Sequence, residues 1–420
     1  MLERYFLKPQ TVDRIRGNWL GSAIERYVEW LEQEGYAARN VYRRVPMLCH
    51  FGQFTQEHGA QTLAQAAALV DDFARHWLSE HAKAGVSKAA KIKIEEESRN
   101  PVNQMLRLVL PEHHGGGRHR QSDPFREEAS GFFPYLREER GLKEASVRHH
   151  RHYLNRFAAF LVRQEVTSLK QLSTAILAAF VVDSAPELSP SSRRGLCAVL
   201  KMFLRYCQRE RVLTHDLSQA VEMPQAYRLA VLPRSISWDD VRRMLAVVDR
   251  RTVRGRRDYA ILLLLITYGL RAHEVASLTL DDIDWQRDRL QVPERKAGHW
   301  TAYPLAKVVG TAIVAYLQDR RPQTEDRHIF FRTLAPRLPL RASAISQSAG
   351  FYLRQAGITV RRAGAHTLRH TCVQRLVDAE FSLKAIGDYV GHRSPSSTEI
   401  YAKVATEALR EVALGDGESL

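Results

Sequence analysis

Cysteine is scarce in this sequence, and the cysteines present are not arranged as a disulfide framework or a metal-binding cluster. The 420 residues contain only four, scattered along the chain without a C-x-x-C pair: Cys49, Cys197, Cys207 and Cys372. Small disulfide-stabilised domains and zinc modules use several closely spaced cysteines. We therefore expect four reduced, mostly buried thiols in an intracellular protein.

Long apolar runs are also lacking. The longest, ILLLLITYGL at residues 261–270, is about half the length that a helix needs to span a bilayer. The N-terminal segment MLERYFLKPQTVDRIRG has no apolar core of the kind found in signal peptides. We expect no membrane partner and a cytoplasmic location.

Acidic side chains are outnumbered by basic ones. The sequence has 62 Lys and Arg against 47 Asp and Glu, which gives a formal charge of +15 and a pI of about 9.8. A surplus of this size attracts polyanions and favours nucleic acid or an anionic membrane surface as a partner. Charge alone is weak evidence, because many basic proteins never touch nucleic acid.

Two linker-like stretches divide the chain. Residues 111–125 contain three consecutive glycines and several basic residues and offer no apolar face to bury, and prolines lie at or near both ends of residues 225–236. A chain of this length can form two or three domains, each with its own core. We predict an N-terminal helical domain, a second helical domain and a C-terminal domain, at residues 1–110, 126–224 and 237–420.

Apolar residues recur at helical spacing through most of the chain. Ile24, Tyr27, Val28 and Leu31, for example, fall on one face of a helix. We predict helices after about residue 306 as well, up to a tail that should fray. The expected fold is mainly α, with helical N-terminal and second domains.

One segment of the C-terminal domain has a different pattern. Residues 281–305 alternate in polarity and contain a turn at Ala297-Gly298. This pattern predicts a short β-hairpin with Lys296 at its tip. The C-terminal domain is therefore expected to be α-rich (α+β), with a small β-sheet.

The first two domains match one another at an offset of about 106 residues. The shift pairs residues of the same type in the same order: Gly35 with Gly141, Val41 with Val147, Leu48 with Leu154, Phe51 with Phe157, Phe54 with Phe160, Leu63 with Leu169 and Gln65 with Gln171. Two amphipathic helices joined by a glycine turn would produce part of this pattern by chance. An internal duplication and a coincidental likeness both remain open.

Basic residues gather on two predicted helices of the second domain. The candidates for DNA binding are Arg148, Arg151, Arg156, Arg193, Arg194 and Lys201. A solvated helix face would explain either cluster alone. Two clusters on neighbouring helices of a basic chain favour contacts to the phosphates of double-stranded DNA, with a strongly salt-dependent affinity.

The C-terminal domain contains side chains that together could break a phosphodiester bond. Displacement at phosphorus concentrates negative charge on the non-bridging oxygens, and arginine meets that charge with a planar, permanently charged donor group. The attacking group must be a hydroxyl, and the leaving sugar oxygen needs a proton. The residues available for these roles are Arg271, Lys296, His366, Arg369, His392 and Tyr401.

The motifs that carry these residues resemble those of the tyrosine recombinase (phage integrase) family. The matching segments are GLRAHEVASL with Arg271, HTLRHT with His366 and Arg369, and GHRSPSSTEIY with His392 and Tyr401. The tyrosine follows the histidine by nine residues, as in the family pattern. Each residue alone has an ordinary structural interpretation, whereas their joint occurrence in order and at compatible spacing does not.

The resemblance implies further roles. Lys296 matches the family's catalytic lysine by its position in the predicted hairpin, and Glu274 matches an acidic residue that supports the first arginine. The likeness covers residues 235–408 well and extends as helical architecture to 129–220. The N-terminal unit is an addition to the minimal family pattern.

By this resemblance the protein would be a bacterial, nucleoid-associated, site-specific DNA recombinase or integrase that works through a 3′-phosphotyrosyl intermediate. It would need neither metal nor ATP. It would act on double-stranded DNA as a homo-tetramer or in a hetero-assembly with related recombinases. A zinc site made from His366, His370 and His392 lacks a supporting motif.

Two alternatives remain open. The chain could be a DNA-binding accessory member of a mobile element that carries several recombinases. It could also be a topoisomerase-like enzyme that nicks and reseals one duplex without pairing two sites.

Overall fold

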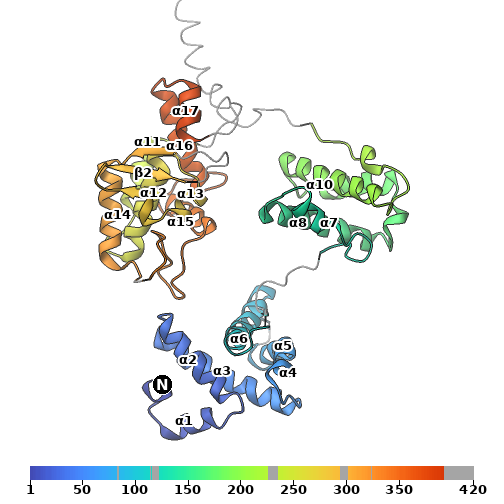
Figure 1. The fold of residues 1–420 in the computed structure, drawn as a ribbon, viewed down its shortest axis with the longest axis vertical. Helices are drawn as coiled ribbons and strands as arrows, with labels where there is room; N and C mark the ends of the chain where they lie inside the picture. Colours follow the sequence, from blue (N-terminus) through green and yellow to red (C-terminus); the bar gives the residue numbers. More distant parts are fainter. Residues whose placement is uncertain are drawn as a thin grey trace, which may run out of the picture. The chain divides into compact units, whose positions relative to one another are not determined.

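The computed structural model describes residues 1–82, 85–113, 115, 123–225, 235–293, 301–322 and 324–391. It is mainly α-helical with one three-stranded sheet (Figure 1), which confirms the predicted fold class. The chain divides into two compact units, residues 117–230 and residues 1–116 with 231–420. Most of both predicted linkers lies outside the described residues.

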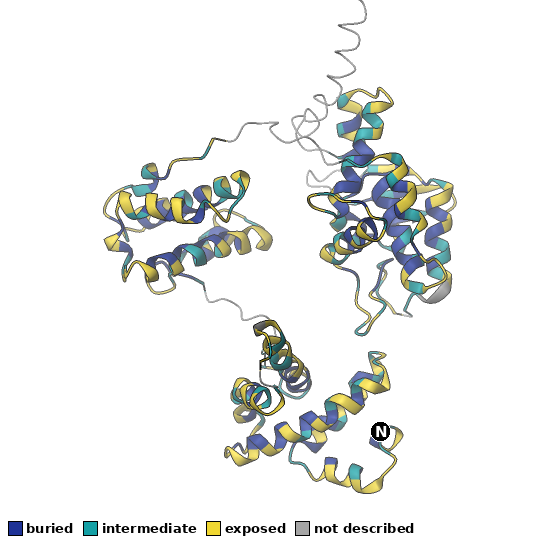
Figure 2. Cartoon of the chain, turned by 180° about the vertical axis from the view of Figure 1, so that it is seen from behind, coloured by how far each residue is buried: buried dark blue, intermediate teal, exposed yellow. Residues whose placement is uncertain are grey.

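Three large hydrophobic cores form within residues 2–109, 125–221 and 236–389. Most helices around them have a buried and an exposed side (Figure 2), as their amphipathic sequences predict. Within the described ranges, no helix is both long and apolar enough to cross a membrane.

The N-terminal part is built only from helices in its described residues. They are η1 (Leu2–Arg4), α1 (Pro9–Arg16), α2 (Gly21–Gln33), α3 (Ala38–Glu57), α4 (Leu63–Ala68), α5 (Val70–His81) and α6 (Lys88–Val109). The predicted stripe of Ile24, Tyr27, Val28 and Leu31 on α2 is fully buried.

The central part is also helical. Its elements are α7 (Phe132–Glu138), α8 (Glu144–Arg163), η2 (Leu169–Gln171), α9 (Thr174–Ser184), α10 (Pro190–Arg209) and η3 (Leu217–Ala220). Helix α10 begins at Pro190, because the Ser189 hydroxyl accepts a hydrogen bond from the Ser192 N–H (3.3 Å) and proline suits the first helical position.

Local backbone features recur 106 residues apart in these two parts. Helices α3 and α8 each contain 20 residues and begin at Ala38 and Glu144. Both are followed by a left-handed residue, Gly59 (φ 77°) or Glu165 (φ 56°). Capping boxes, each made by a hydroxyl residue and a glutamine three positions later, then start the next helical element: Thr62 with Gln65 and Ser168 with Gln171.

The cores of the two parts share an aromatic arrangement. Phe51 and Phe54 on α3 lie 5.1 and 5.5 Å from the ring of Phe73, measured between ring centroids. The matching pairs in the central part are Phe157 with Phe180 (4.8 Å) and Phe160 with Phe180 (5.3 Å). The likeness between the two parts thus includes similar aromatic packing, although Phe180 follows Phe73 by 107 positions rather than 106.

The two parts differ on the outer face of the long helix. In the N-terminal part, Tyr5 and Phe6 pack edge-on against Tyr42 of α3, with ring centroids 6.3 and 6.0 Å apart. The Asn18 side chain donates to the Cys49 carbonyl (3.0 Å). At the 106-residue offset Tyr42 corresponds to Arg148 of α8, so the first residues of the chain partly cover the face that is basic in the central part.

The C-terminal part surrounds one buried helix, α12 (Val253–Thr267), in which residues 260–266 are all buried. Around it lie α11 (Trp238–Ala246), α13 (Ala272–Ser277), η4 (Leu280–Asp282), α14 (Lys307–Arg320), α15 (Ala342–Gln355), α16 (Ala365–Asp378) and α17 (Leu383–Val390). The sheet is antiparallel and has the order β1 (Ile283–Asp284), β2 (Arg289–Val292), β3 (Thr301–Pro304).

The predicted hairpin is confirmed in the part that the structure describes. Val292 of β2 pairs with Thr301 of β3. The tip, including Lys296, lies outside the described residues, and so does the predicted frayed tail at 413–420.

The expectation of helix throughout the segment after residue 306 is wrong for residues 321–341. Helix α14 ends at Arg320, and the next helix begins at Ala342. Three prolines interrupt this stretch, at positions 322, 336 and 339, and each removes a backbone donor that a helix would need. The segment instead forms an isolated antiparallel bridge between Phe331 and Pro339.

The cysteines are free thiols, of which Cys197, Cys207 and Cys372 are buried and Cys49 is half-buried. Burial raises the pKa of Cys207 and of Cys372 to about 12. This agrees with the expectation of reduced, mostly buried thiols.

A buried ion pair joins α12 to its surroundings. The Arg257 Nε and Nη2 atoms donate to Asp258 Oδ1 (2.9 and 2.7 Å), and Arg257 Nη1 donates to the Phe331 carbonyl (2.9 Å). Tyr352 of α15 donates from its hydroxyl to Asp258 Oδ2 (3.2 Å). The Asp258 side chain is 0% exposed and that of Arg257 is 6% exposed. The carboxylate thus neutralises a buried cation and links α12 to α15.

We predict that Asp258→Ala lowers the free energy of unfolding by about 3–5 kcal/mol, because it leaves Arg257 buried without its counter-charge. Urea titration followed by circular dichroism measures this change. Asp281→Ala breaks the exposed pair with Arg327 and serves as the control, which should unfold almost like the unmodified protein. Equal urea midpoints of unfolding for Asp258→Ala and Asp281→Ala would contradict a stabilising role for the buried Arg257–Asp258 pair.

Candidate active site

Arg271 occupies the N-cap position of α13, directly after the turn that ends α12. Its backbone N–H donates to Glu274 Oε2 (2.7 Å), and its Nη1 donates to Glu274 Oε1 (2.8 Å). The Glu274 side chain is 1% exposed and that of Arg271 is 25% exposed. One buried carboxylate therefore caps the helix and orients a guanidinium that still reaches solvent.

The turn before Arg271 requires glycine. Gly269 has a φ of +59°, and a Cβ atom there would lie 3.1 Å from Val390 Cγ1 and 3.2 Å from Cys372 Sγ. The missing side chain lets the end of α12 approach α16 and α17 closely. These three helices carry or precede the candidate residues, so this approach brings the segments of the site together.

Arg369 lies on α16 and is only 3% exposed. Its Nη1 donates to the Gly269 carbonyl, and its Nη2 donates to the Val390 carbonyl at the end of α17 (2.8 Å). Arg271 donates from Nη2 to the next carbonyl, that of Gly391 (3.0 Å). The two guanidiniums thus converge on adjacent peptide groups, although the residues lie 98 positions apart in the sequence.

His366 precedes Arg369 by one helical turn on α16 and is exposed. Its ring packs edge-on against that of His370, with centroids 4.8 Å apart. Sequence reasoning considered His370 only as a zinc ligand. The structure places it next to a candidate catalytic histidine, which the i, i+4 spacing on a helix could have indicated.

Three candidates, Lys296, His392 and Tyr401, lie outside the described residues. The described site consists of Arg271, Glu274, His366 and Arg369. Gly391, whose carbonyl binds Arg271, directly precedes His392 in the chain. In the described part, no group of three His, Cys, Asp or Glu side chains is placed to hold a metal ion.

The predicted DNA-binding residues lie on α8 and α10 of the central part. Arg151 pairs with Asp123 and Arg156 with Glu187, each at 2.6 Å. Arg148 and Arg194 are exposed, while Arg193 and Lys201 are half-buried. The two helices touch near these residues, since a Cβ added to Gly195 of α10 would lie 3.4 Å from His149 Nε2 of α8. The two basic clusters are therefore adjacent, with Arg148 and Arg194 the most accessible.

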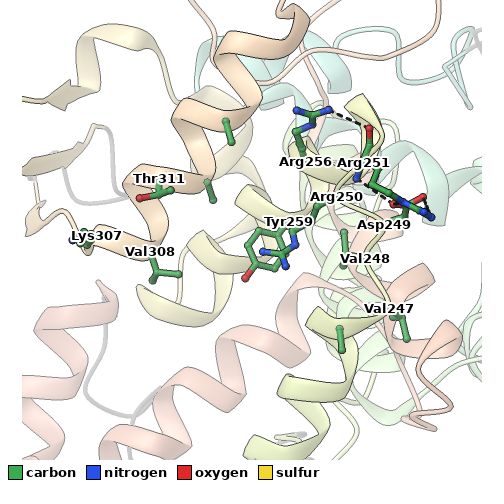
Figure 3. Close-up of a pocket in the computed structure, with 13 residues that line it drawn as sticks. Val247, Val248, Asp249, Arg250, Arg251, Arg256, Tyr259, Lys307, Val308 and Thr311 are labelled. Atoms are coloured by element: carbon green, nitrogen blue, oxygen red, sulfur yellow. Dashed lines mark hydrogen bonds and ion pairs between the residues drawn. The ribbon is translucent and has the colours of Figure 1, made fainter.

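A cavity of about 1130 Å³ is lined by other residues (Figure 3). It lies between the α11–α12 loop, α12 and α14, where Arg250 stacks over Tyr259 (4.9 Å) and Lys307 and Val308 form part of the wall. None of the candidate catalytic residues that the structure describes lines it. We take Arg271 and Arg369 as the candidate site because the sequence motifs carry them; the wall of the cavity is also basic but contains neither.

Two arginines from different helices, one anchored by a buried carboxylate and one buried beside a histidine-bearing face, define a site suited to one phosphodiester. The phage integrase family model matches residues 234–408, and the model of the phage integrase N-terminal SAM-like domain matches residues 129–211.

Whole-chain relatives agree with these matches. The chain is 30% identical over 403 residues to the integrase/recombinase y4rA of Sinorhizobium fredii, covering 92% of each protein. It is 28% identical over 289 residues to the tyrosine recombinase XerD of Listeria monocytogenes, an alignment that covers 67% of this chain and 95% of that protein. This chain therefore belongs to the phage integrase family of tyrosine recombinases, enzymes that cleave and rejoin DNA strands.

The fold of solved structures is similar. The XerH site-specific recombinase, in a complex with its palindromic difH substrate, superposes with a TM-score of 0.55 at 15% identity, covering 84% of this chain and 96% of that one. At this identity the likeness concerns the fold. The similarity to XerD leaves about a third of this chain unmatched, whereas the similarity to y4rA spans nearly all of it.

We predict that Glu274→Ala slows DNA cleavage about 10²-fold, because Arg271 loses the carboxylate that orients it, and small displacements of a catalytic group cost this much. Glu274→Gln keeps an oxygen acceptor and should lose less. The rate of covalent protein–DNA adduct formation at saturating DNA measures the effect. Asp239→Ala, at an exposed position of α11, provides the control; Glu274→Ala reacting as fast as this control would refute the role.

Proposed function

We propose that this protein is a site-specific DNA recombinase or integrase that cuts and rejoins strands through a 3′-phosphotyrosyl intermediate. The observation that supports this most strongly is the convergence of Arg271 and Arg369 on the end of α17, next to His392 in the sequence. Guanidiniums in these positions could each donate two hydrogen bonds to one phosphate.

In the proposed reaction, the Tyr401 oxygen attacks the scissile phosphorus and the bond from phosphorus to the 5′-oxygen breaks. Arg271 and Arg369 stabilise the charge on the non-bridging oxygens. Lys296 donates a proton to the leaving 5′-oxygen, and His366 and His392 assist by hydrogen bonding or proton transfer. A 5′-hydroxyl of the partner strand then attacks the phosphotyrosine and releases Tyr401. The phosphotyrosyl bond conserves the energy of the phosphodiester, so the cycle requires neither ATP nor a metal ion.

We propose three domains, at residues 1–110, 126–224 and 237–420. The central part would bind the DNA backbone through the adjacent basic clusters of α8 and α10. We further propose that the N-terminal part is a second copy of the central fold. The equal lengths of α3 and α8, the two capping boxes and the matched phenylalanine clusters support a duplication.

The assembly proposed is a tetramer on DNA, made of this chain alone or together with related recombinases. The XerH neighbour was solved on its difH substrate. We place such an enzyme in the bacterial cytoplasm at the nucleoid, where its substrate is.

A DNA relaxer would act on a single DNA site, whereas a recombinase needs two. An accessory subunit would need a partner recombinase. Assays with one or two sites, and with one or two proteins, distinguish these alternatives.

Tyr401→Phe should abolish covalent capture of DNA, because it removes the attacking oxygen, while leaving DNA affinity unchanged. The assay uses duplexes from the flanks of the gene, with metal chelated, followed by denaturing electrophoresis and, in parallel, binding titration. Tyr42→Phe in α3 controls for loss of a tyrosine elsewhere. A covalent adduct formed by Tyr401→Phe would overturn the proposed mechanism.

The proposed DNA-binding face can be tested by salt dependence. Arg148→Ala combined with Arg194→Ala should weaken DNA binding and make the negative slope of log K against log salt shallower by about 2, since each phosphate contact contributes about −0.9 to it. The matched control replaces Arg43 and Lys91, exposed cations on α3 and α6 of the N-terminal part, and should leave the slope unchanged. A larger loss in the control than in the test variant would assign the DNA contact to the other copy.

A further inference from the structure

We propose that Tyr303 is a positioning residue, which holds the β-hairpin that carries Lys296 against the segment that leads to the nucleophile. This inference rests on the proposed function, because it concerns the alignment of the general acid with the attacking tyrosine on one phosphate. The sequence motifs gave no signal for it.

Tyr303 lies on β3, the return strand of the hairpin, and is 3% exposed. Its hydroxyl donates a hydrogen bond to the backbone carbonyl of Tyr389 on α17. The two rings also pack edge-on, with centroids 5.1 Å apart and planes at 78°. The contact therefore joins two elements that lie 86 residues apart in the sequence.

The carbonyl that Tyr303 binds is the first of three consecutive ones bound by side chains at the end of α17. Val390 accepts from Arg369 and Gly391 accepts from Arg271. The last carbonyls of a helix have no partner within the helix and carry its negative dipole end. Here donors from β3, α16 and the start of α13 bind three of them, immediately before His392.

Both Tyr303 and Tyr389 also contact the end of α12. The Tyr389 hydroxyl donates to the Thr267 carbonyl at the end of α12 (3.0 Å). Tyr268 packs against Tyr303, with ring centroids 5.0 Å apart. The Tyr268 hydroxyl donates to the Pro304 carbonyl (3.0 Å) and accepts from the Ala306 N–H (2.8 Å). Tyr268 thus anchors the base of the hairpin to α12, and Tyr303 is the tyrosine that links the hairpin to α17.

This link joins the two elements that adjoin the reacting segments in the sequence. Lys296 precedes β3 by five residues, and His392 follows Tyr389 by three. In the proposed reaction, proton delivery to the 5′-oxygen must coincide with attack by Tyr401 from the opposite side of the phosphorus. A hydroxyl that fixes the hairpin relative to α17 would set the position of the acid without touching the DNA.

The test compares Tyr303→Phe on two substrates, an ordinary duplex and one with a 5′-bridging phosphorothiolate at the cleavage position. Sulfur leaves as a thiolate and needs no proton, so a misplaced acid no longer slows the reaction. We expect Tyr303→Phe to form the adduct about 10²-fold more slowly on the oxygen substrate and within a few-fold of the unmodified rate on the sulfur substrate. DNA affinity should stay unchanged.

Tyr316→Phe is the matched control, because it removes another buried tyrosine hydroxyl of the C-terminal part, one whose hydrogen-bond partner is the Phe331 N–H (3.2 Å). Its ratio of sulfur to oxygen rates should equal that of the unmodified protein. Equal losses on both substrates for Tyr303→Phe, or no loss on either, would overturn the positioning role. Absence of any adduct with the unmodified protein on both substrates would instead overturn the proposed function.

Discussion

The end of α17 depends on side chains from three other elements to satisfy its backbone. Its last carbonyl groups accept hydrogen bonds from Tyr303, Arg369 and Arg271, which come from β3, α16 and the start of α13. Both arginines proposed to bind the scissile phosphate are thus held by the helix that leads to His392. The same contacts order the site and couple its parts, because moving α17 would displace carbonyl acceptors of both guanidiniums.

This arrangement places strict demands on the surrounding packing. Two guanidiniums can lie close together only if carboxylate or carbonyl oxygens offset their charge. Glu274 does this for Arg271, and the Gly269 and Val390 carbonyls do it for Arg369. Gly269 favours the close approach, since its φ of +59° suits glycine and a Cβ there would lie 3.1 Å from Val390 Cγ1 and 3.2 Å from Cys372 Sγ, closer than ordinary contact. The short turn between α12 and α13 therefore helps to bring the segments of the site together.

Much of this could be predicted from the sequence, and the rest fails for identifiable reasons. Apolar periodicity gave the helices and alternation gave the β2–β3 hairpin, because both reflect local burial. Residues 321–341 depart from the predicted helix because their prolines remove backbone donors, even though helices flank the segment on both sides. The role proposed for Tyr303 cannot be predicted from the sequence, since the hydrogen-bond partner of its hydroxyl is a backbone carbonyl 86 residues away. The cover over Tyr42 by Tyr5 and Phe6 is likewise a tertiary contact that periodicity does not encode.

The most direct test is to identify the atom that becomes bonded to DNA. The adduct would be trapped on a nicked duplex, digested with nuclease and trypsin, and sequenced by mass spectrometry. Cleavage after Arg393 and Lys403 gives the peptide SPSSTEIYAK, in which Tyr401 is the only tyrosine. A nucleotide attached through its 3′-phosphate to this tyrosine is the expected result. Attachment to any other peptide would contradict the assignment of the nucleophile and, with it, the site assembled around α17.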